Sequence, residues 1–337
     1  MAATIYEVAA LAGVSPATVS RVLNGGSVSE AYAQRVREAV ETLQFRPNRT
    51  ARSLRRQRSE IIALIIPDIE NPFFTALARG VEDEALRAGY AVVLCNTDEH
   101  LDKEERYLEM ALSGHIAGVV LAPASAATRL ETLVERGMPV VTVDRPAHGH
   151  EVDSVVMDDV EAARRATTAL YDQGFSRVAC ITGPHDVDTA ANRAAGWREI
   201  FRARTPGVDP GRYVRYADYR VPGGRAAMSA LLGLAEPPDA VFVANNLMSV
   251  GALQELVEAG HRPPGVGLAS LGELPFLPPG TAGVTVEPWP ARALGTAAAS
   301  LLVERIHGAT GPARRLVVGS SGDAVETPRE AAAPPAP

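Results

Sequence analysis

The sequence predicts a small all-α unit built around a helix-turn-helix, followed by a larger two-lobed α/β core. Three observations carry this prediction. Helical periodicity around a glycine turn fills residues 4–24, an arginine-rich segment follows, and from residue 61 apolar runs of strand length alternate with helical patterns. At 337 residues the chain has room for two or three domains.

Residues 4–24 are typical of two short helices around a tight turn. Thr4 can cap the first helix, and Glu7 completes a capping box three residues later. Gly13 stands at the turn, where a residue without a Cβ atom costs least. Ser15 can cap the second helix, with Pro16 at its first position, where a missing N–H costs nothing.

The second helix is expected to have one apolar and one polar face. The apolar face consists of aliphatic residues, Val19, Val22 and Leu23, and the outer face of small residues and one arginine, Ala17, Thr18, Ser20 and Arg21. Such an outer face suits the major groove of DNA. An ordinary helical hairpin fits the same spacing, because helix-turn-helix patterns are degenerate.

A third helix is expected to begin at Ser29-Glu30 and to stop before Pro47, which cannot continue a helix. Six arginines and no acid follow from Arg46 to Arg58, with Leu54 as an isolated apolar residue. A basic segment can follow phosphates, and an isolated leucine can wedge between base steps in the minor groove. A solvated linker would have the same composition, so this alternative stays open.

Three motifs resemble the headpiece and hinge of the lactose-repressor (LacI) family: Val-Ser-Pro-Ala-Thr-Val-Ser-Arg-Val-Leu-Asn at 14–24, Val-Ser-Glu at 28–30 and Phe-Arg-Pro-Asn-Arg-Thr-Ala-Arg-Ser-Leu at 45–54. The resemblance implies an operator-binding regulator whose hinge folds on DNA and inserts Leu54 at the central step. It implies base contacts by Ser15, Ala17 and Arg21, and phosphate contacts by Tyr6, Ser20 and Asn24. The expected DNA-contacting set is completed by Thr4, Pro16, Thr18, Asn48 and Arg52.

Charge is distributed unevenly along the chain. Residues 1–60 contain nine arginines and five glutamates, a net charge of +4, whereas the whole chain has a net charge of −7. A basic headpiece on an acidic body directs attraction for nucleic acid to one end. Without a membrane-length apolar run or a visible secretory signal, a cytoplasmic location is expected. Cys95 and Cys180 lie in apolar runs, which predicts two buried free thiols.

From residue 61 the pattern predicts about ten strands separated by helices. Strands are expected at 61–67, 91–95, 117–121, 139–143, 178–182, 213–216, 240–244, 266–269, 283–286 and 315–318. Helices are expected at 73–89, 102–113, 128–136, 160–173, 189–203, 222–234, 247–259 and 290–307. This alternation predicts parallel sheets covered on both faces, and ten strands exceed one ordinary sheet, so two lobes are expected.

The pattern over residues 60–319 also resembles the periplasmic-binding-protein-like core of LacI-type regulators. The resemblance implies three crossings between the lobes, near Asp159, Pro288 and Gly319, and a small ligand in the cleft. The expected domains are a headpiece at 1–47, a hinge at 48–59, a core at 60–319 and a disordered tail at 320–337. Lobe 1 is expected at about 60–159 and 289–318, and lobe 2 at about 160–288.

Polar residues follow several predicted strands, and ligands of α/β sheets bind at the carboxyl ends of strands. Carboxylates, amides and arginine bond hydroxyls, and aromatic rings stack on C–H faces, so this set suits a polyol. The candidate residues are Asn71, Phe73, Phe74, Asp144, Arg145, Asp158, Arg193 and Asn245, and the resemblance adds Tyr219, Glu273 and Glu287. Each also has a structural interpretation, as a cap or turn residue, a core ring or a surface ion pair.

The chain departs from the family pattern at two places. Asn245-Asn246 replaces the usual Asn-Asp, and Ser270-Leu-Gly-Glu273 replaces the usual Gly-Phe-Asp-Asp. The second change removes an acidic hydroxyl acceptor at Gly272, which argues against plain glucose, galactose or ribose. A modified, larger or anionic ligand, or a pocket without a ligand, stays open.

Other function classes are disfavoured by the sequence. Gly-x-Gly-x-x-Gly, His-Glu-x-x-His and Gly-x-Ser-x-Gly motifs are absent, so no cofactor is expected and an NAD-dependent enzyme is the weaker alternative. His148 and His150 near Asp153 could ligate a metal, but a solvated loop is the preferred interpretation. A transport solute-binding protein would need a signal peptide in place of the headpiece.

The tail at 320–337 has no leucine heptad, which disfavours a tail-mediated tetramer. The expected assembly is a homodimer on an inverted-repeat operator, because paired half-sites match twofold symmetry. A repressor controlled by a sugar or sugar derivative is the preferred interpretation. The sequence leaves open whether the effector releases the protein from DNA or retains it there.

Overall fold

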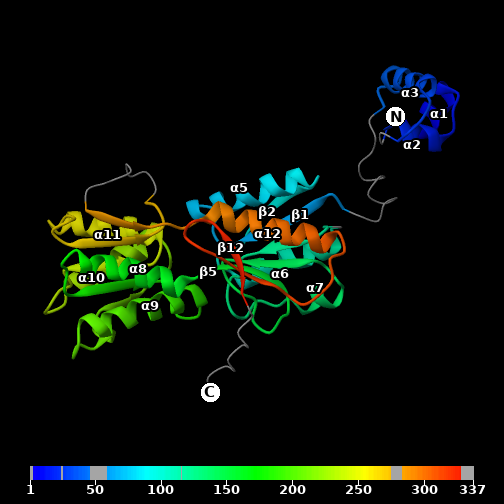
Figure 1. Ribbon diagram of the computed structural model, residues 1–337. Helices are drawn as coiled ribbons and strands as arrows, with labels where there is room; N and C mark the ends of the chain where they lie inside the picture. Colours follow the sequence, from blue (N-terminus) through cyan, green and yellow to red (C-terminus); the bar gives the residue numbers. More distant parts are fainter. Residues whose placement is uncertain (1–2, 24–25, 46–58, 115, 275–282, 328–337) are drawn as a thin grey trace. The chain divides into compact units, whose positions relative to one another are not determined.

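The computed structural model describes residues 3–23, 26–45, 59–114, 116–274 and 283–327 (Figure 1). The chain divides into two compact units, Met1–Ser59 and Glu60–Pro337. Each unit has an apolar core of its own.

The described part of the first unit consists of α1 (Ile5–Ala12), α2 (Pro16–Leu23) and α3 (Glu30–Thr42). These helices confirm the helix-turn-helix and pack around Val8, Val19 and Val36, which are fully buried. The third helix ends at Thr42, earlier than the proline that was expected to stop it.

The predicted caps of the first two helices are confirmed. The Glu7 amide donates to Thr4 Oγ1 over 3.3 Å, and the Thr4 amide donates to Glu7 Oε2 over 2.6 Å. Gly13 ends α1 with φ at 63°, a left-handed conformation that favours glycine. Ser15 Oγ accepts from the Thr18 amide over 3.1 Å at the start of α2.

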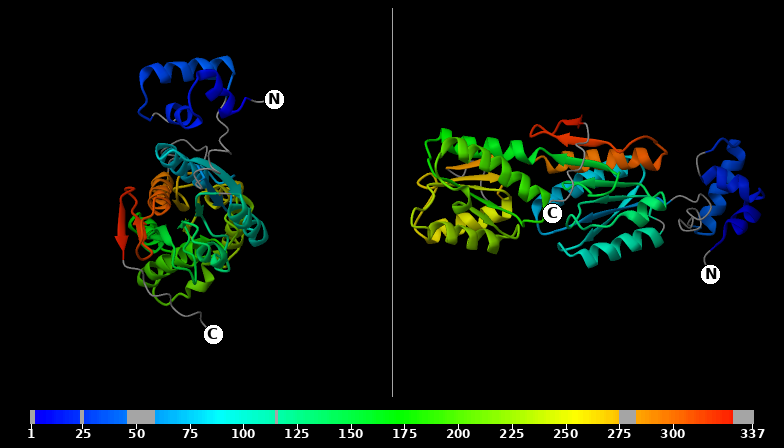
Figure 2. Two further views of the ribbon diagram at one scale, coloured as in Figure 1. Left: turned by 90° about the vertical axis from the view of Figure 1, so that its right-hand side faces the viewer. Right: turned by 90° about the horizontal axis from the view of Figure 1, so that it is seen from below.

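Lobe 1 of the second unit is built on a seven-stranded sheet with the order β12-β11-β5-β4-β3-β1-β2 (Figure 1, Figure 2). All neighbouring strands are parallel except β11 and β12. The strands are β1 (Ile61–Ile66), β2 (Ala91–Asn96), β3 (Val119–Leu121), β4 (Val140–Val143), β5 (Asp153–Met157), β11 (Arg315–Val318) and β12 (Ala324–Thr327).

Helices cover both faces of this sheet. The pair α5 (Pro72–Arg87) and α12 (Ala291–Ile306) lies on one face, and α6 (Leu101–Ser113) and α7 (Glu131–Glu135) lie on the other. Strand β1 supplies both cores, because Ile62 and Leu64 pack in the cluster of α5, while Ala63 and Ile65 pack in that of α6. This continuous burial explains why β1 is an unbroken apolar run.

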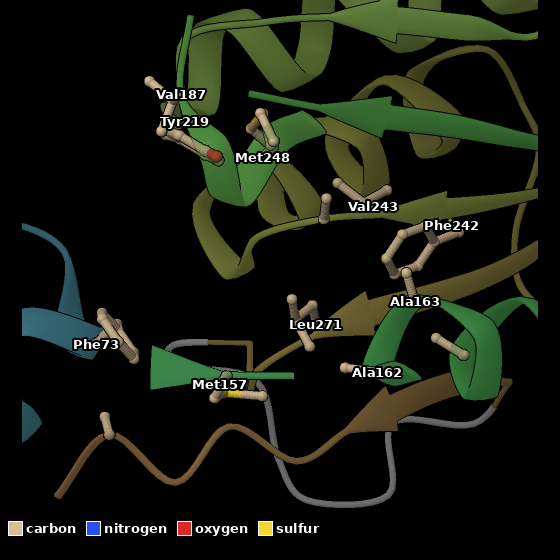
Figure 3. Packing of buried hydrophobic residues seen from close by; sticks show 14 of the residues in the cluster. Phe73, Met157, Ala162, Ala163, Val187, Tyr219, Phe242, Val243, Met248 and Leu271 are labelled. Carbon is tan, nitrogen blue, oxygen red and sulfur yellow. The ribbon is translucent and has the colours of Figure 1, made fainter. Parts of the chain in front are cut away.

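Lobe 2 is built on a five-stranded, all-parallel sheet with the order β10-β9-β8-β6-β7. Its strands are β6 (Val178–Thr182), β7 (Val214–Tyr216), β8 (Ala240–Val243), β9 (Gly267–Leu271) and β10 (Val284–Glu287). Its helices are α8 (Asp159–Asp172), α9 (Asp188–Arg204), α10 (Val221–Leu232) and α11 (Asn246–Glu258), with a 3₁₀ turn at Pro210–Arg212. Figure 3 shows part of its core, where Ala163 of α8 lies next to Phe242 of β8.

The helix pair α5 and α12 packs with its backbones in contact. A Cβ atom at Gly80 would lie 2.1 Å from the Arg292 carbonyl oxygen, and one at Gly295 would lie 2.1 Å from that of Leu77. Any side chain at either position would therefore separate the two helices. Because α12 follows the second crossing between the lobes, this contact fixes the crossing to lobe 1.

Two strands lie outside the predicted set. Strand β5 was not predicted because the polar residues Asp153 and Ser154 interrupt its apolar run. Both residues are nevertheless buried. The expectation of disorder from residue 320 is wrong for β12, because a hairpin closed by the Gly319 amide and the Asp323 carbonyl returns the chain onto β11. A third crossing to lobe 2 was expected near Gly319, but the hairpin keeps the chain in lobe 1 up to Thr327. Residues 328–337 lie outside the described residues.

Within the described ranges, the chain passes between the sheets after β5, near Asp159, and after β10, near Pro288. Cys95 and Cys180 are buried and free, as predicted, and burial raises the pKa of both thiols. No helix among the described residues is long and apolar enough to cross a bilayer.

Asp153 joins β5 to the C-terminal part of lobe 1. Its carboxylate, 1% exposed, accepts from Arg305 Nε and Nη2 over 2.8 Å each and from the Arg314 amide over 2.7 Å. Burial alone would raise the pKa of Asp153, but these bonds reverse the effect and leave the pKa lowered. The contacts of Asp153 with Arg305 and Arg314 therefore stabilise the fold only while its carboxyl group is ionised.

Asp153→Asn is expected to lower the free energy of unfolding by about 2–4 kcal/mol at neutral pH, because two partly exposed arginines lose a buried partner. Since the folded-state pKa is depressed, this stabilisation is present above the unfolded-state pKa and is lost as the pH falls through the folded-state value. Urea unfolding at about pH 7 and about pH 3 measures both effects. The exposed control Asp172→Asn should change stability little, and equal stability of the two variants at neutral pH would contradict the prediction.

Candidate functional site

A cavity lies between the two lobes, at the carboxyl ends of both sheets. It is lined from lobe 1 by Asp68, Asn71, Phe73, Phe74, Glu99, Asp144 and Arg145, from lobe 2 by Thr189, Arg193, Asp218, Tyr219, Arg220 and Asn245, and from the second crossing by Trp289. Its free volume is about 20 Å³, room for about one water molecule. The lobes are closed on each other, and side chains fill most of the space between them.

Arg145, directly after β4, is held in place by Glu99 and by backbone. Its guanidinium donates to the two Glu99 oxygens over 2.8 and 2.9 Å, and to the carbonyls of Pro123 and Ala124 over 2.9 and 3.1 Å. Five donors in a planar group suit such multiple bonding. The cation is therefore fixed and neutralised on the lobe 1 side of the cavity.

Asp144 stands beside Arg145 in an unusual environment. Its φ of 67° is left-handed, and such strain in a non-glycine residue persists only where the surroundings enforce it. Its carboxylate is buried and lies 3.7 Å from Arg145 Nε, without a hydrogen-bond partner among the described residues. Burial raises the pKa of Asp144 against the opposing charges of Arg145 and Arg193. This carboxylate is available to a hydrogen-bond donor in the cavity.

Arg193 on α9 links three segments on the lobe 2 side. Its Nε donates to Asp159 Oδ1 over 2.7 Å, and its Nη1 donates to the Ala244 carbonyl over 2.9 Å. The guanidinium carbon lies 4.4 Å from the centroid of the Trp289 ring. Burial raises the pKa of Asp159 to about 6, despite the attraction of Arg193. Arg193 is thus a buried cation with one charged partner and one aromatic partner.

Tyr219 is positioned by the backbone of Gly183, which has no side chain, and by two polar neighbours. Its φ is 62°, and a Cβ atom at Gly183 would lie 2.0 Å from the ring, so the tyrosine depends on that glycine. Its hydroxyl lies 2.8 Å from Thr189 Oγ1. Asn245 caps α11 and donates to the Tyr219 carbonyl over 3.3 Å. These contacts fix one wall of the cavity.

Aromatic rings form a further wall. Phe73 and Trp289 are stacked, with centroids 4.0 Å apart and planes at 27°, and Phe74 meets Phe73 edge-on at 4.9 Å. Figure 3 shows Phe73 and Tyr219 on different segments of the apolar cluster to which both belong. The indole nitrogen of Trp289 is buried and has no hydrogen-bond partner among the described residues.

Two polar contacts join the lobes next to the cavity. His148 Nε2 lies 2.6 Å from Asp188 Oδ2, and Arg220 Nη2 donates to Asp98 Oδ1 over 2.5 Å. All four side chains are partly exposed. Each contact adjoins cavity residues in the sequence, so closure of the lobes and the geometry of the cavity are coupled.

The arrangement can hold a small hydrogen-bonding molecule between carboxylates, amides and aromatic faces. The structure does not support the metal alternative. His148 and His150 have different partners, the latter accepting from the Leu130 amide over 3.3 Å. The described residues contain no group of three or more His, Cys, Asp or Glu side chains that could hold a metal ion.

Most of the predicted cleft residues line the cavity: Asn71, Phe73, Phe74, Asp144, Arg145, Arg193, Tyr219 and Asn245. Three predicted acids do not line this cavity. Asp158 is exposed and caps α8, while its neighbour Asp159 takes the buried position. Glu287 bonds Arg165 over 2.6 Å and Glu273 is exposed, and neither lines the cavity.

Six lining residues lie outside the candidate set of the sequence analysis: Asp68, Glu99, Thr189, Asp218, Arg220 and Trp289. Glu99 follows β2, Asp218 and Arg220 follow β7, and Trp289 follows β10. The rule that ligands bind at the carboxyl ends of strands would have found these four. Trp289 lacked a second signal, because a tryptophan after a strand is also typical of a core.

On the first unit, the predicted contact residues of α1 and α2 lie at or near the surface. Tyr6, Ser15, Ala17 and Arg21 are exposed, and Pro16, Thr18 and Ser20 are half-buried. The Thr4 hydroxyl is engaged with Glu7 in the capping box. Asn24, Asn48, Arg52 and Leu54 lie outside the described residues.

Comparison with known families gives two matches along the chain. Residues 4–48 match the model described as bacterial regulatory proteins, lacI family. Residues 59–319 match the model of periplasmic binding proteins and the sugar-binding domain of the LacI family. Together the two matches cover both units.

Individual relatives are regulators by name. The chain is 36% identical over 262 residues to the ribose operon repressor of Halalkalibacterium halodurans, covering 77% of each chain. It is 31% identical to the transcriptional repressor PurR of Aliivibrio fischeri, covering 90% of this chain and 92% of the relative. The solved complex of the regulator CelR with cellobiose has a TM-score of 0.71 at 32% identity, covering 97% and 99%. An operator-bound lac repressor dimer has the same fold, with a TM-score of 0.83 at 22% identity, covering 95% of this chain and 97% of that one.

The environment of Trp289 is expected to report the ionisation of Asp159. Below a pH of about 6, Asp159 takes up a proton and no longer acts as a charged partner of Arg193, whose guanidinium lies over the indole. The difference in emission between the wild type and Trp289→Phe isolates Trp289 from Trp197. We expect this difference to change with a midpoint near pH 6, and Asp159→Asn to remove the transition. A midpoint that persists in Asp159→Asn would assign it to another group.

Proposed function

This chain belongs to the LacI family of bacterial regulatory proteins, which are DNA-binding transcriptional regulators, and we propose how its two units divide that work. The headpiece reads an inverted-repeat operator as part of a homodimer, and the cleft binds a small polar effector that changes operator affinity. The observation that carries the proposal is a closed, polar cleft lined by Asp144, Arg193 and Tyr219 in a chain that also bears a helix-turn-helix.

The exposed side of α2 supports the operator half of the proposal. Arg21 is exposed and can bond guanine bidentately, while Ser15 and Ala17 are exposed at the amino-terminal end of the same helix. Tyr6 is 67% exposed, in keeping with a phosphate contact rather than a core role. Pro16, Thr18, Ser20 and Thr4 complete the part of the proposed DNA-contacting surface that lies within the described residues.

The charges of the cleft favour an uncharged hydroxyl-bearing effector over an anion. Arg145, Arg193 and Arg220 are each hydrogen-bonded to another carboxylate, whereas the Asp144 carboxyl group lies 3.7 Å from Arg145 Nε, beyond hydrogen-bond distance. A hydroxyl can hydrogen-bond to that carboxyl group, while an anion would find each of the three arginines already neutralised. The cellobiose complex of a 32% identical regulator agrees with a carbohydrate or carbohydrate derivative.

An exposed apolar surface supports the homodimer. Leu86 on α5 is 70% exposed, and Val93 and Leu94 are 40% and 37% exposed on β2, the edge strand of the lobe 1 sheet. An edge strand with exposed apolar side chains is a natural pairing surface. Two copies joined there by a twofold axis would present two headpieces to paired half-sites.

We infer no enzymatic function, because the relatives and the family models describe regulators. A protein that acts on operator DNA works in the cytoplasm, and we propose that location for this chain. A solute-binding protein with the same core remains the second candidate, and specific operator binding separates the two.

Arg21→Ala is expected to relax base preference at one position of each half-site, by about 1–3 kcal/mol of discrimination. Selection from a random duplex library, read by sequencing, measures the recovered motif. Arg37→Ala on α3, where Arg37 is paired with Glu30, is the matched control and should return the wild-type motif. If Arg21→Ala also returns it, Arg21 has no reading role. Wild-type binding that does not distinguish a palindrome from a scrambled duplex would remove the operator function itself.

Asp144→Asn is expected to weaken effector binding at least tenfold while leaving operator affinity unchanged. The substitution keeps the shape of a buried side chain and replaces one accepting carboxyl oxygen with an amide NH2, which loses a hydrogen bond of about 1.5–3 kcal/mol when the ionised carboxylate accepts it. Thermal-shift screening of neutral, amino and phosphorylated sugars identifies a ligand, and calorimetry then compares the variants. The exposed control Asp323→Asn should bind as the wild type does. Equal affinity of Asp144→Asn would remove Asp144 from the site.

A further inference from the structure

We propose that the indole of Trp289 is an internal occupant of the cleft, which the effector displaces on binding. The proposal rests on the proposed function of the cleft as an effector site. In this account the protein without effector is stabilised in its closed form by one of its own side chains.

The indole already occupies a sandwich of the kind a ring-shaped ligand would fill. Phe73 of lobe 1 stacks on one face at 4.0 Å, and Arg193 of lobe 2 lies 4.4 Å from the centroid. Trp289 therefore bridges the lobes by stacking and cation–π contact. The cavity that remains, about 20 Å³, is far too small for a sugar ring. A ligand must move a side chain, open the lobes, or do both.

Trp289 has no hydrogen bond among the described residues, unlike the large polar side chains Arg145, Arg193 and Tyr219 that line the cavity with it. Arg145 makes four hydrogen bonds, Arg193 has Asp159 and Ala244 as acceptors, and the Tyr219 hydroxyl is bonded to Thr189. The Trp289 nitrogen is buried without any partner among the described residues, which is unfavourable for an N–H group. Moving the indole breaks no hydrogen bond and allows its N–H to be satisfied.

Gly272 provides the space that the indole uses. A Cβ atom at Gly272 would lie 3.1 Å from Trp289 Cε3, closer than an ordinary van der Waals contact. Gly272 itself has φ at 84°, and its amide donates to the Glu287 carbonyl over 2.9 Å, which ties it to the strand before Trp289. Because Trp289 lies on the crossing from β10 to α12, displacing its side chain acts on the joint between the lobes.

Trp289→Ala tests the proposal with free indole as the probe. The truncation leaves an indole-sized space between Phe73 and Arg193, as deleted core rings leave cavities that bind the missing group. We expect the variant's operator dissociation constant to differ at least tenfold from that of the wild type, and saturating indole to return it to within threefold. The wild type should not respond to indole, and Trp289→Phe should behave nearly as the wild type does.

Acrylamide quenching of the unmodified protein provides a second test that needs no variant. Trp197 is fully buried, so quenching of the two-tryptophan chain reports mainly on Trp289. An effector found by the thermal-shift screen should increase the quenching, because the indole leaves its sandwich. Decreased quenching would make Trp289 a fixed wall that the ligand covers, and would overturn the proposal. A folded Trp289→Ala with unchanged operator affinity and no indole response would also overturn it.

These outcomes differ from a failure of the proposed function. If the wild type bound no operator, or no screened sugar raised its melting temperature, the regulator assignment of the two units would be at fault. Binding of indole by Trp289→Ala, measured by calorimetry with wild type as control, would still decide whether Trp289 occupies the cleft.

Discussion

The buried ion pair between Arg193 and Asp159 is the interaction on which the arrangement of the lobes depends. Asp159 begins α8 at the first crossing, Ala244 follows β8, and Trp289 lies on the second crossing, and Arg193 contacts all three. One guanidinium group therefore contacts both segments in which the chain passes between the lobes. A buried pair of this kind contributes little net stability but penalises every geometry that separates its charges. The pair therefore determines how the two lobes are arranged more than it raises the free energy of unfolding.

The closed cleft follows from how its charges are distributed. Arginines on both lobes are already neutralised by carboxylates, so the lobes can approach without bringing bare cations together. The exception is Asp144, whose strained backbone and buried carboxylate are maintained by the surrounding fold. A site that leaves the Asp144 carboxyl group, the Arg145 Nε–H and the Trp289 N–H without hydrogen bonds among the described residues is poised for a change of partners, which is what an effector-controlled regulator requires.

The sequence predicted the architecture well and the cleft in part, for physical reasons. Strands such as β1 are buried on both faces and so appear as unbroken apolar runs, whereas β5 carries Asp153, whose ion pairs depend on residues more than 150 positions away. In the cleft, Asp144 and Arg145 followed from their place after a strand. Glu287 lies outside the cavity lining, because Arg165 of α8, distant in sequence, provides its partner there. The role of Trp289 depends on Gly272, Phe73 and Arg193 meeting in space, and no local pattern records that meeting.

The two contacts that join the lobes beside the cleft, His148 with Asp188 and Arg220 with Asp98, lie at the solvent boundary. Attraction between partly exposed charges weakens as dissolved ions screen it, and so does attachment of a basic headpiece to phosphates. Ionic strength would therefore act on both units of the chain at once, in addition to the effector. In a bacterium whose internal salt concentration follows the external osmolarity, the same effector concentration would then leave a different fraction of the operator occupied in dilute and in concentrated surroundings.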